Sequence, residues 1–204
     1  MKLRKVILPV FVAVIVAAVA YGASVVRRGF STRTQPSRVE AVVARTMRNW
    51  SIPRADREEP NPWAEAATPE VMADARAHWA GHCASCHAND GSGQTEIGQN
   101  LYPKAPDMRL PATQNLTDGE LYYIIRNGIR LTGMPAWGDP DALQDDESWQ
   151  LVLFIRHLPQ IRPEELKEME RLNPKTEAQR VSEVEAERFL NEGTAPQSHE
   201  QMRH

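Results

Sequence analysis

Hydrophobic residues are most concentrated at the start of the chain. Residues 6–26 form an uncharged run of 21 residues, preceded by a basic stretch at residues 1–5 and followed by two arginines. As a helix rising 1.5 Å per residue, this run spans about 30 Å, the thickness of a bilayer's hydrocarbon core. The pattern therefore predicts a transmembrane segment over residues 1–26. A cleaved signal peptide is the alternative, because residues 18–20 (Ala-Val-Ala) offer a small-residue cleavage site.

Later in the chain, hydrophobic residues recur at helical spacing between capping signals. Residues 69–87 read as one helix. A capping box spans Thr117–Glu120 ahead of an apolar face, and Gly128 is a natural stop. Asp145–Glu147 place negative charge at the start of a further helix, whose apolar face runs to Leu158. The sequence contains no convincing alternating strand pattern, so the predicted fold is all-α, with three or more helices.

The regions on either side of these helices have a different composition. Residues 27–67 contain several prolines and residues 49–63 lack helical periodicity, so an extended tether is predicted there, either free or packed on the domain. Residues 163–192 read as two helices, the second preceded by a capping box at Thr176–Gln179. The predicted organisation is a transmembrane or signal segment at 1–26, a tether at 27–67, a helical domain at 68–162, a helical extension at 163–192 and a disordered tail at 193–204.

Charge narrows the classes of partner. From Arg27 onward the chain has 21 basic and 27 acidic residues, a net charge of −6. A mildly acidic chain of this kind is not expected to bind nucleic acid. Such a chain favours a partner with a basic docking face, because attraction between opposite charges would steer the association of the two proteins. The acidic run at residues 139–147 is a candidate for that steering, and a solvated loop and helix start is the alternative.

Both cysteines lie in the sequence GHCASCH, residues 81–87. A C-x-x-C pair serves in dithiol redox switches, in zinc sites and in covalent haem attachment. The histidine directly after the second cysteine favours haem, with thioethers at Cys83 and Cys86 and with His87 as an iron ligand. A closed zinc site needs a second ligand pair, and the remaining histidines (78, 82, 157, 199 and 204) do not form one. A thioredoxin-like switch needs a βαβ frame, which the pattern lacks.

A second axial ligand to iron has one preferred candidate. Met134 lies in the sequence GIRLTGMPAWG, where Gly133 permits unusual backbone angles and Pro135 fixes the chain that follows. A methionine on such a loop suits a thioether held against a flat macrocycle, because methionine otherwise fills gaps in a core. Met108, His157 and Met169 are the competing candidates. Packing under a turn is the alternative role for Met134.

These residues resemble a small single-haem cytochrome c domain of the exported bacterial type. Cys83-Ala-Ser-Cys86-His87 is followed 47 residues later by Met134 in a G-M-P setting, and the resemblance covers about residues 68–160. It implies one covalently bound haem c, attached to Cys83 and Cys86, with His87 and Met134 as axial ligands of the haem iron.

Two further residues match the family's order of parts. Trp79 stands where the family places the aromatic residue that meets its last helix. Ala75 occupies a position that is often glycine in the family, and this departure implies a slightly wider helix crossing. Candidate contacts to the haem propionates are Tyr102, Arg126, Arg130 and Trp137. Carbonyls of residues 101–106 are candidates to accept a hydrogen bond from His87.

The function implied is single-electron transfer by a carrier that is not an enzyme, because both axial positions of the iron would be filled. The expected partners are redox proteins that the sequence does not specify, together with a membrane through the N-terminal helix. The expected location is the inner membrane, single-pass, with the haem domain on the periplasmic side. A soluble periplasmic form after signal cleavage is the alternative. Two other functions stay open: a cytochrome subunit of a membrane dehydrogenase or oxidase complex, and a haem sensor or enzyme with a labile Met134.

Overall fold

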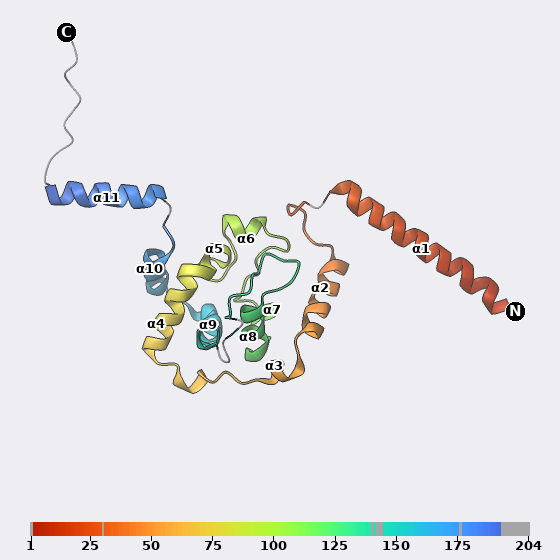
Figure 1. Cartoon of the computed structure of the whole chain (residues 1–204), viewed down its shortest axis with the longest axis horizontal. Coiled ribbons are helices and arrows are strands. Elements are labelled where there is room, and N and C mark those ends of the chain that lie inside the picture. The colour runs from red at the N-terminus through yellow and green to blue at the C-terminus, as the bar shows by residue number, and fades with distance from the viewer. Residues whose placement is uncertain (1, 30, 140, 142–144, 176, 193–204) are drawn as a thin grey trace, which may run out of the picture.

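The computed structural model describes the chain except residues 1, 30, 140, 142–144, 176 and 193–204. Over the described residues the secondary structure is helical and contains no strand, which confirms the all-α prediction (Figure 1). The central helices are α4 (Pro69–His78), α8 (Asp118–Asn127) and α9 (Asp146–His157). The short elements between them are η1 (Ala64–Ala66), η2 (Trp79–Cys83), α5 (Ala84–His87), α6 (Glu96–Asn100) and α7 (Pro111–Gln114).

The central helices begin and end where capping chemistry places them. Thr117 accepts a hydrogen bond from the backbone N–H of Glu120, and the Glu120 side chain accepts one from the backbone N–H of Thr117, as the capping box predicted. Asp145 caps α9 by accepting from the backbone N–H of Ser148 at 3.0 Å. Gly128 ends α8 with a φ of 65°, a conformation that glycine adopts without steric cost.

The core lies where α9 packs between α4 and α8. Trp79 contacts Phe154 of α9, with ring centroids 5.5 Å apart, so the prediction that Trp79 meets the last central helix is confirmed. Tyr122 of α8 stacks on Trp149 of α9 at 3.9 Å. Ala75 is buried on α4, where a small side chain allows the helices to approach. The least exposed large side chains are Trp79, Trp149, Leu151, Val152, Phe154, Ile155, Leu158 and Met169.

The region before α4 is more ordered than the sequence suggested. It forms α2 (Arg38–Ser51) and α3 (Arg54–Glu58), so the prediction of an extended tether over residues 27–67 is wrong there. The reason lies in a capping box between Ser37 and Glu40, which starts a helix between Pro36 and Pro53.

Residues 52–63 wrap around the central helices as part of the compact domain. Ile52 is buried, and the Asn61 amide donates to the carbonyl of Trp149 at 3.1 Å. Arg57 forms an ion pair with Glu120 at 3.3 Å, and its carbonyl accepts from the Thr117 hydroxyl at 2.7 Å. The compact unit therefore starts earlier than residue 68.

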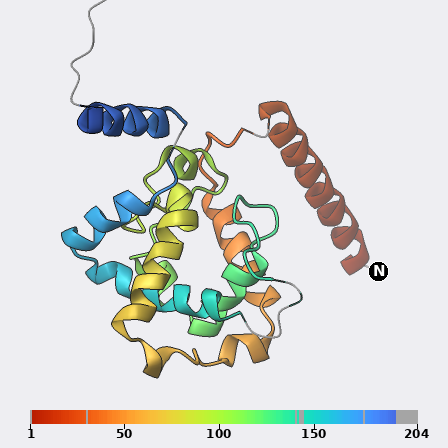
Figure 2. The same ribbon diagram turned by 60° about the vertical axis from the view of Figure 1, so that its left-hand side comes forward.

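The C-terminal helices separate into one that packs and one that projects. After η3 (Leu158–Gln160), α10 (Pro163–Leu172) returns to α4 and buries Met169. The helix α11 (Glu177–Glu192) lies away from the core in both ribbon views (Figure 2). Both helices predicted over residues 163–192 are therefore present. The predicted capping box at Thr176 and the predicted disordered tail at 193–204 fall outside the described residues.

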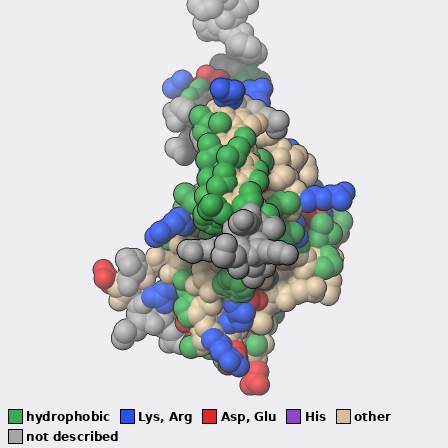
Figure 3. All heavy atoms as spheres, turned by 90° about the vertical axis from the view of Figure 1, so that its right-hand side faces the viewer, with side chains coloured by type: hydrophobic (Ala, Val, Ile, Leu, Met, Phe, Trp, Pro, Cys, Tyr) green, Lys and Arg blue, Asp and Glu red, His purple; other side chains and the backbone are tan. Residues whose placement is uncertain are grey.

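The N-terminal helix α1 (Lys2–Arg28) contains an apolar stretch from Ile7 to Arg27 that is long enough to cross a membrane. None of that stretch is buried inside the protein. Hydrophobic side chains gather along α1 where it faces the viewer in Figure 3. These properties are compatible with a membrane anchor and with a signal sequence.

Candidate functional site

The cysteine motif lies in an unusual helical turn. The helix α4 continues into η2, a π-helical turn over Trp79–Cys83, in which the backbone N–H of Ala84 bonds to the carbonyl of Trp79. The chain then forms α5 and leaves it at Ala88, whose φ of 63° reverses its direction. Such wide turns are rare and often occur at functional sites. We call residues 79–98, from this turn to the middle of α6, the motif turn.

Backbone contacts hold the motif turn tightly. The carbonyl of Cys86 accepts a hydrogen bond from the Thr95 hydroxyl at 3.1 Å, and that of His87 accepts one from the N–H of Gly93 at 2.8 Å. Gly98 approaches so closely that a Cβ atom there would lie 2.1 Å from the Cys86 carbonyl oxygen. The Trp79 indole N–H donates to the Ala88 carbonyl at 3.0 Å. The motif is therefore fixed by its neighbours before any ligand is considered.

Cys83 and Cys86 are both free thiols and both partly buried. Burial, and to a smaller extent the nearby Cys86, raise the pKa of the Cys83 thiol to about 12. A catalytic dithiol switch depends on a thiol whose pKa is lowered, because the thiolate is the nucleophile. The environment of Cys83 is therefore the opposite of the one that a thioredoxin-like switch requires.

The His87 ring is in a state suited to ligate a metal. Burial lowers its pKa, while the backbone carbonyl of Pro106 acts in the opposite direction by accepting a hydrogen bond. The buried Nδ1 atom nevertheless has no hydrogen-bond partner of regular geometry. The imidazole is thus neutral at pH 7, and neutral imidazole is the form that binds metal ions. The Pro106 carbonyl belongs to the segment 101–106 in which an acceptor for His87 was predicted.

Met134 lies on a loop that returns along α8, which we call the methionine loop (residues 128–138). The Met134 carbonyl accepts from the N–H of Ile129 at 3.1 Å, and its N–H donates to the Thr132 hydroxyl at 3.1 Å. The N–H of Trp137 donates to the carbonyl of Ile125 on α8 at 3.1 Å. Bonds within the loop and to the end of α8 therefore determine its path, and the Met134 side chain stays half exposed.

The methionine loop meets the motif turn and its neighbours. The rings of Trp137 and His82 lie 5.5 Å apart, and His82 directly precedes Cys83. A Cβ atom at Gly133 would lie 2.6 Å from the Leu101 side chain, in the segment that ends at Pro106. The predicted site residues therefore come from three segments that contact one another.

The residues present fit a haem. Two thiols and a neutral imidazole lie in one turn, and the imidazole has a buried nitrogen without a regular partner. Apolar side chains of the surrounding segments remain uncovered, with Ile97 52% and Leu131 93% exposed. A flat apolar ring held in this region would cover surface of this kind.

A comparison with protein families agrees with this chemistry. The model for cytochrome C oxidase, cbb3-type, subunit III matches residues 70–155. The chain contains a c-type cytochrome domain. None of the curated proteins matches the chain. The matched stretch runs through α4, the motif turn, the methionine loop and most of α9, and it excludes α1, α2, α10 and α11.

The other candidate iron ligands have structural roles. Met108 is half buried, packs against the hydrophobic core and donates its backbone N–H to Gly91 at 2.8 Å. Met169 is fully buried on α10. His157 bonds to both carboxylate oxygens of Glu165 at 3.0 and 3.1 Å. Met134 is the candidate that the packing does not already explain.

The four residues predicted to contact the haem propionates lie in different surroundings in the structure. Trp137 lies beside the motif turn, as described above, and Arg130 is exposed on the methionine loop. Arg126 donates to the Tyr122 hydroxyl at 2.8 Å, and the Tyr102 hydroxyl donates to the carboxylate of Glu40 on α2. The structure therefore does not bring these four side chains together as one group.

Sequence reasoning missed residues that support the motif. Thr95 and Gly98 fix the Cys86 carbonyl, and Glu165 of α10 pairs with Arg76 of α4 at 3.2 Å. The signal for Thr95 was present, since it caps α6 by accepting from the N–H of Gly98. The Glu165 pairing joins residues 89 positions apart, so no local pattern indicates it.

Proposed function

We propose that the protein carries single electrons through one haem c attached by thioether bonds to Cys83 and Cys86. The observation that carries the proposal is the neutral, half-buried His87 imidazole directly after two thiols, inside the stretch that matches the cytochrome family. When bound, the haem supplies an iron that alternates between the ferrous and ferric states. The chain holds that group at a fixed position and limits access to it.

His87 and Met134 are the proposed axial ligands of the haem iron. The Pro106 carbonyl acts on the His87 ring as a hydrogen-bond acceptor, and an outer partner of this kind orients metal-bound histidines. The thioether of Met134 favours the ferrous state relative to a second histidine and so raises the reduction potential. With both positions filled, no vacant site would remain for a substrate, which is why a carrier is proposed.

The proposed location is the periplasmic side of the inner membrane, with α1 retained as a single-pass anchor. The apolar stretch Ile7–Arg27 has the required length, and maturation that attaches haem c takes place on the exported side. Redox proteins are the proposed partners. The net charge of −6 from Arg27 onward favours partners with a basic docking face.

A second candidate function is membership of a membrane oxidase or dehydrogenase complex as its cytochrome subunit. The family that matches residues 70–155 is described as an oxidase subunit, which favours this candidate. The projecting helix α11 also exposes Val184, Phe189 and Leu190, which a larger assembly could cover. In that case the electron would pass within one complex instead of between diffusing partners.

The decisive experiment is to express the full chain in a host that attaches haem c and to measure intact mass and the visible spectrum. We expect the mass of one haem on the chain, Met1 retained, and the weak red absorption band of iron–sulfur ligation. The substitution Met134→Ala should abolish that band and allow carbon monoxide to bind the ferrous iron. Met108→Ala, the matched control, should keep the band. A mass without haem, or a band unaffected by Met134→Ala, would refute the proposal.

Purification in mild detergent separates the carrier from the subunit. An isolated carrier elutes alone, whereas the subunit of a complex co-purifies with a large partner in fixed stoichiometry. Truncation before α11 should release that partner if α11 forms the contact, while leaving the haem spectrum unchanged.

A further inference from the structure

The helix α2 has an apolar face that the rest of the protein does not cover. Successive residues of a helix are rotated by about 100°, so the residues at 39, 42, 43, 47 and 50 fall on one side. All of these side chains are exposed: Val39, Val42, Val43, Met47 and Trp50. The exposed fraction reaches 74% for Val39 and 82% for Trp50.

The opposite side of α2 faces the cytochrome domain, and contacts with that domain fix the orientation of the helix. Ala41 and Arg48 are half buried there. The Asn49 carbonyl accepts a hydrogen bond from Arg57 of α3, and the Glu40 carboxylate accepts one from the Tyr102 hydroxyl. Because these two contacts hold α2 at both ends, the helix is not free to rotate. Its apolar face therefore points outward.

The placement and charge of α2 indicate what covers that face. The helix starts at Arg38, and the membrane-length stretch of α1 ends at Arg27. The residues between them include a turn, in which the Thr34 hydroxyl donates to the Ser31 carbonyl at 3.0 Å, so they reach less than the about 35 Å of an extended chain. The face is thus kept near the surface of any bilayer that α1 crosses.

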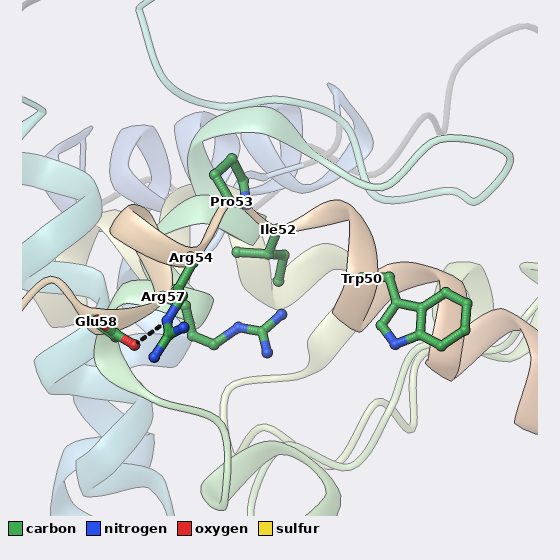
Figure 4. Close-up of a pocket in the computed structure, with 6 residues that line it drawn as sticks. All are labelled: Trp50, Ile52, Pro53, Arg54, Arg57 and Glu58. Atoms are coloured by element: carbon green, nitrogen blue, oxygen red, sulfur yellow. Dashed lines mark hydrogen bonds and ion pairs between the residues drawn. The ribbon is translucent and has the colours of Figure 1, made fainter.

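Arginine and tryptophan side chains accompany the apolar face. Arg38 and Arg45 are exposed on α2 along one flank of the apolar face. A shallow hollow of about 620 Å³ adjoins the end of α2, lined by Trp50, Ile52, Pro53, Arg54, Arg57 and Glu58 (Figure 4). An apolar stripe, a terminal tryptophan and flanking arginines characterise helices that lie in the headgroup region of a membrane.

We propose that α2 lies on the bilayer surface, with its apolar face in the boundary between acyl chains and phosphates. Its arginines would contact the anionic phosphates of lipid headgroups. This inference rests on the proposed function in one respect, the retention of α1 as an anchor. The consequence is that the cytochrome domain is oriented against the membrane, so that its redox partner meets it at the membrane surface.

Lipid photocrosslinking tests the inference in the full chain. A photoreactive benzoylphenylalanine is introduced at Val43, on the apolar face, or at Ala44, which is exposed on the other side of α2. The chain is reconstituted in vesicles of three parts phosphatidylethanolamine and one part phosphatidylglycerol. We expect several-fold more lipid adduct, measured by mass, at position 43 than at position 44. A third chain carries the same group at Val14 of α1.

The outcomes separate the inference from the proposed function. Equal adduct yields at 43 and 44, or no lipid adduct at 43 while Val14 gives one, would overturn the surface placement of α2. A protein adduct at 43, with a partner or with a second copy of the chain, would also overturn it. Absence of lipid adduct at Val14 would instead contradict the retained anchor. The haem content of each sample is measured separately, so a failure of haem attachment cannot be mistaken for either result.

Discussion

The motif turn and the methionine loop contribute the two proposed faces of one haem site, yet they are built differently. In the motif turn, the carbonyls of Cys86 and His87 are each bonded by neighbouring groups, and Trp79 behind them is fully buried. The methionine loop depends on bonds within itself and on the end of α8, and it leaves Leu131 exposed. The chain therefore fixes one face of the site, the motif turn, by packing, and leaves the other face, the methionine loop, adaptable.

The largest expected effect tests the packing behind the motif turn. Trp79→Ala should lower the free energy of unfolding by about 3–5 kcal/mol, because it leaves a cavity between α4 and α9. Trp137→Ala, in the methionine loop, should cost below about 1 kcal/mol, since that side chain is 41% exposed. Urea unfolding followed by circular dichroism measures both. Equal costs would remove the proposed difference between the two regions.

A matched pair of glycines sharpens the comparison. Gly98→Ala should destabilise the protein by about 2–3 kcal/mol, because the new methyl group meets the backbone carbonyl of Cys86. Gly133→Ala meets only the end of the Leu101 side chain, which can rotate away, so its cost should be below about 1 kcal/mol. The same unfolding measurement applies. A larger loss at Gly133 than at Gly98 would show that the methionine loop is the more rigid region.

Acid should loosen the helix that supports the motif turn. Burial opposes ionisation of Glu165, but hydrogen bonds from His157 and from the backbone and side chain of Arg162 outweigh it and lower its pKa from 4.5 to about 2. A carboxylate with a lowered pKa stabilises the fold above pH 4.5, and that contribution is lost as the pH falls toward 2.

The substitution Glu165→Gln isolates this contribution. It should cost about 2 kcal/mol at pH 7, because it removes a charged partner of Arg76 and His157. It should also flatten the dependence of stability on pH between about 4.5 and 2. Glu168→Gln is the control, since its side chain is 53% exposed. A variant with an unchanged acid profile would contradict the assigned role of Glu165.

The smallest effect on stability is expected for a volume-conserving change in the methionine loop. Met134→Leu should alter the free energy of unfolding of the haem-free chain by less than about 1 kcal/mol, whereas the iron–sulfur band of the loaded protein should disappear. Met169→Leu, in the core, should keep the band. If both variants keep it, another group ligates the iron.

The sequence predicted those features of the fold that depend on local chemistry. The capping box at Thr117, the stop at Gly128 and the contact of Trp79 with α9 were all predicted, because each depends on spacing within a helix or on a known order of parts. The helix α2 was missed, although Ser37 and Glu40 have capping-box spacing and the apolar residues after them recur at helical intervals. The prolines that follow favoured the prediction of an extended chain instead.

Long-range pairings were beyond sequence reasoning for a physical reason. The contacts of Asn61 with Trp149 and of Arg76 with Glu165 join segments whose separation in the chain leaves no periodic signal. The cysteines and His87 of the candidate site could be read from one short motif. Their support by Thr95 and Gly98 depends on how the intervening loop folds, whereas a carbonyl of residues 101–106, the segment that contains Pro106, was predicted as the partner of His87.

The π-helical turn at Trp79–Cys83 makes the length of this stretch as important as its composition. In that turn each N–H reaches back five residues, one more than in an α-helix. If the wide turn is kept, deleting one of these residues moves every later residue by one position, which is about 100° around the helix axis. His87 would then leave the side of the helix on which Trp79 supports it. Homologous chains that share this geometry should therefore differ in the identity of the residues between the tryptophan and the histidine, but not in the number of those residues.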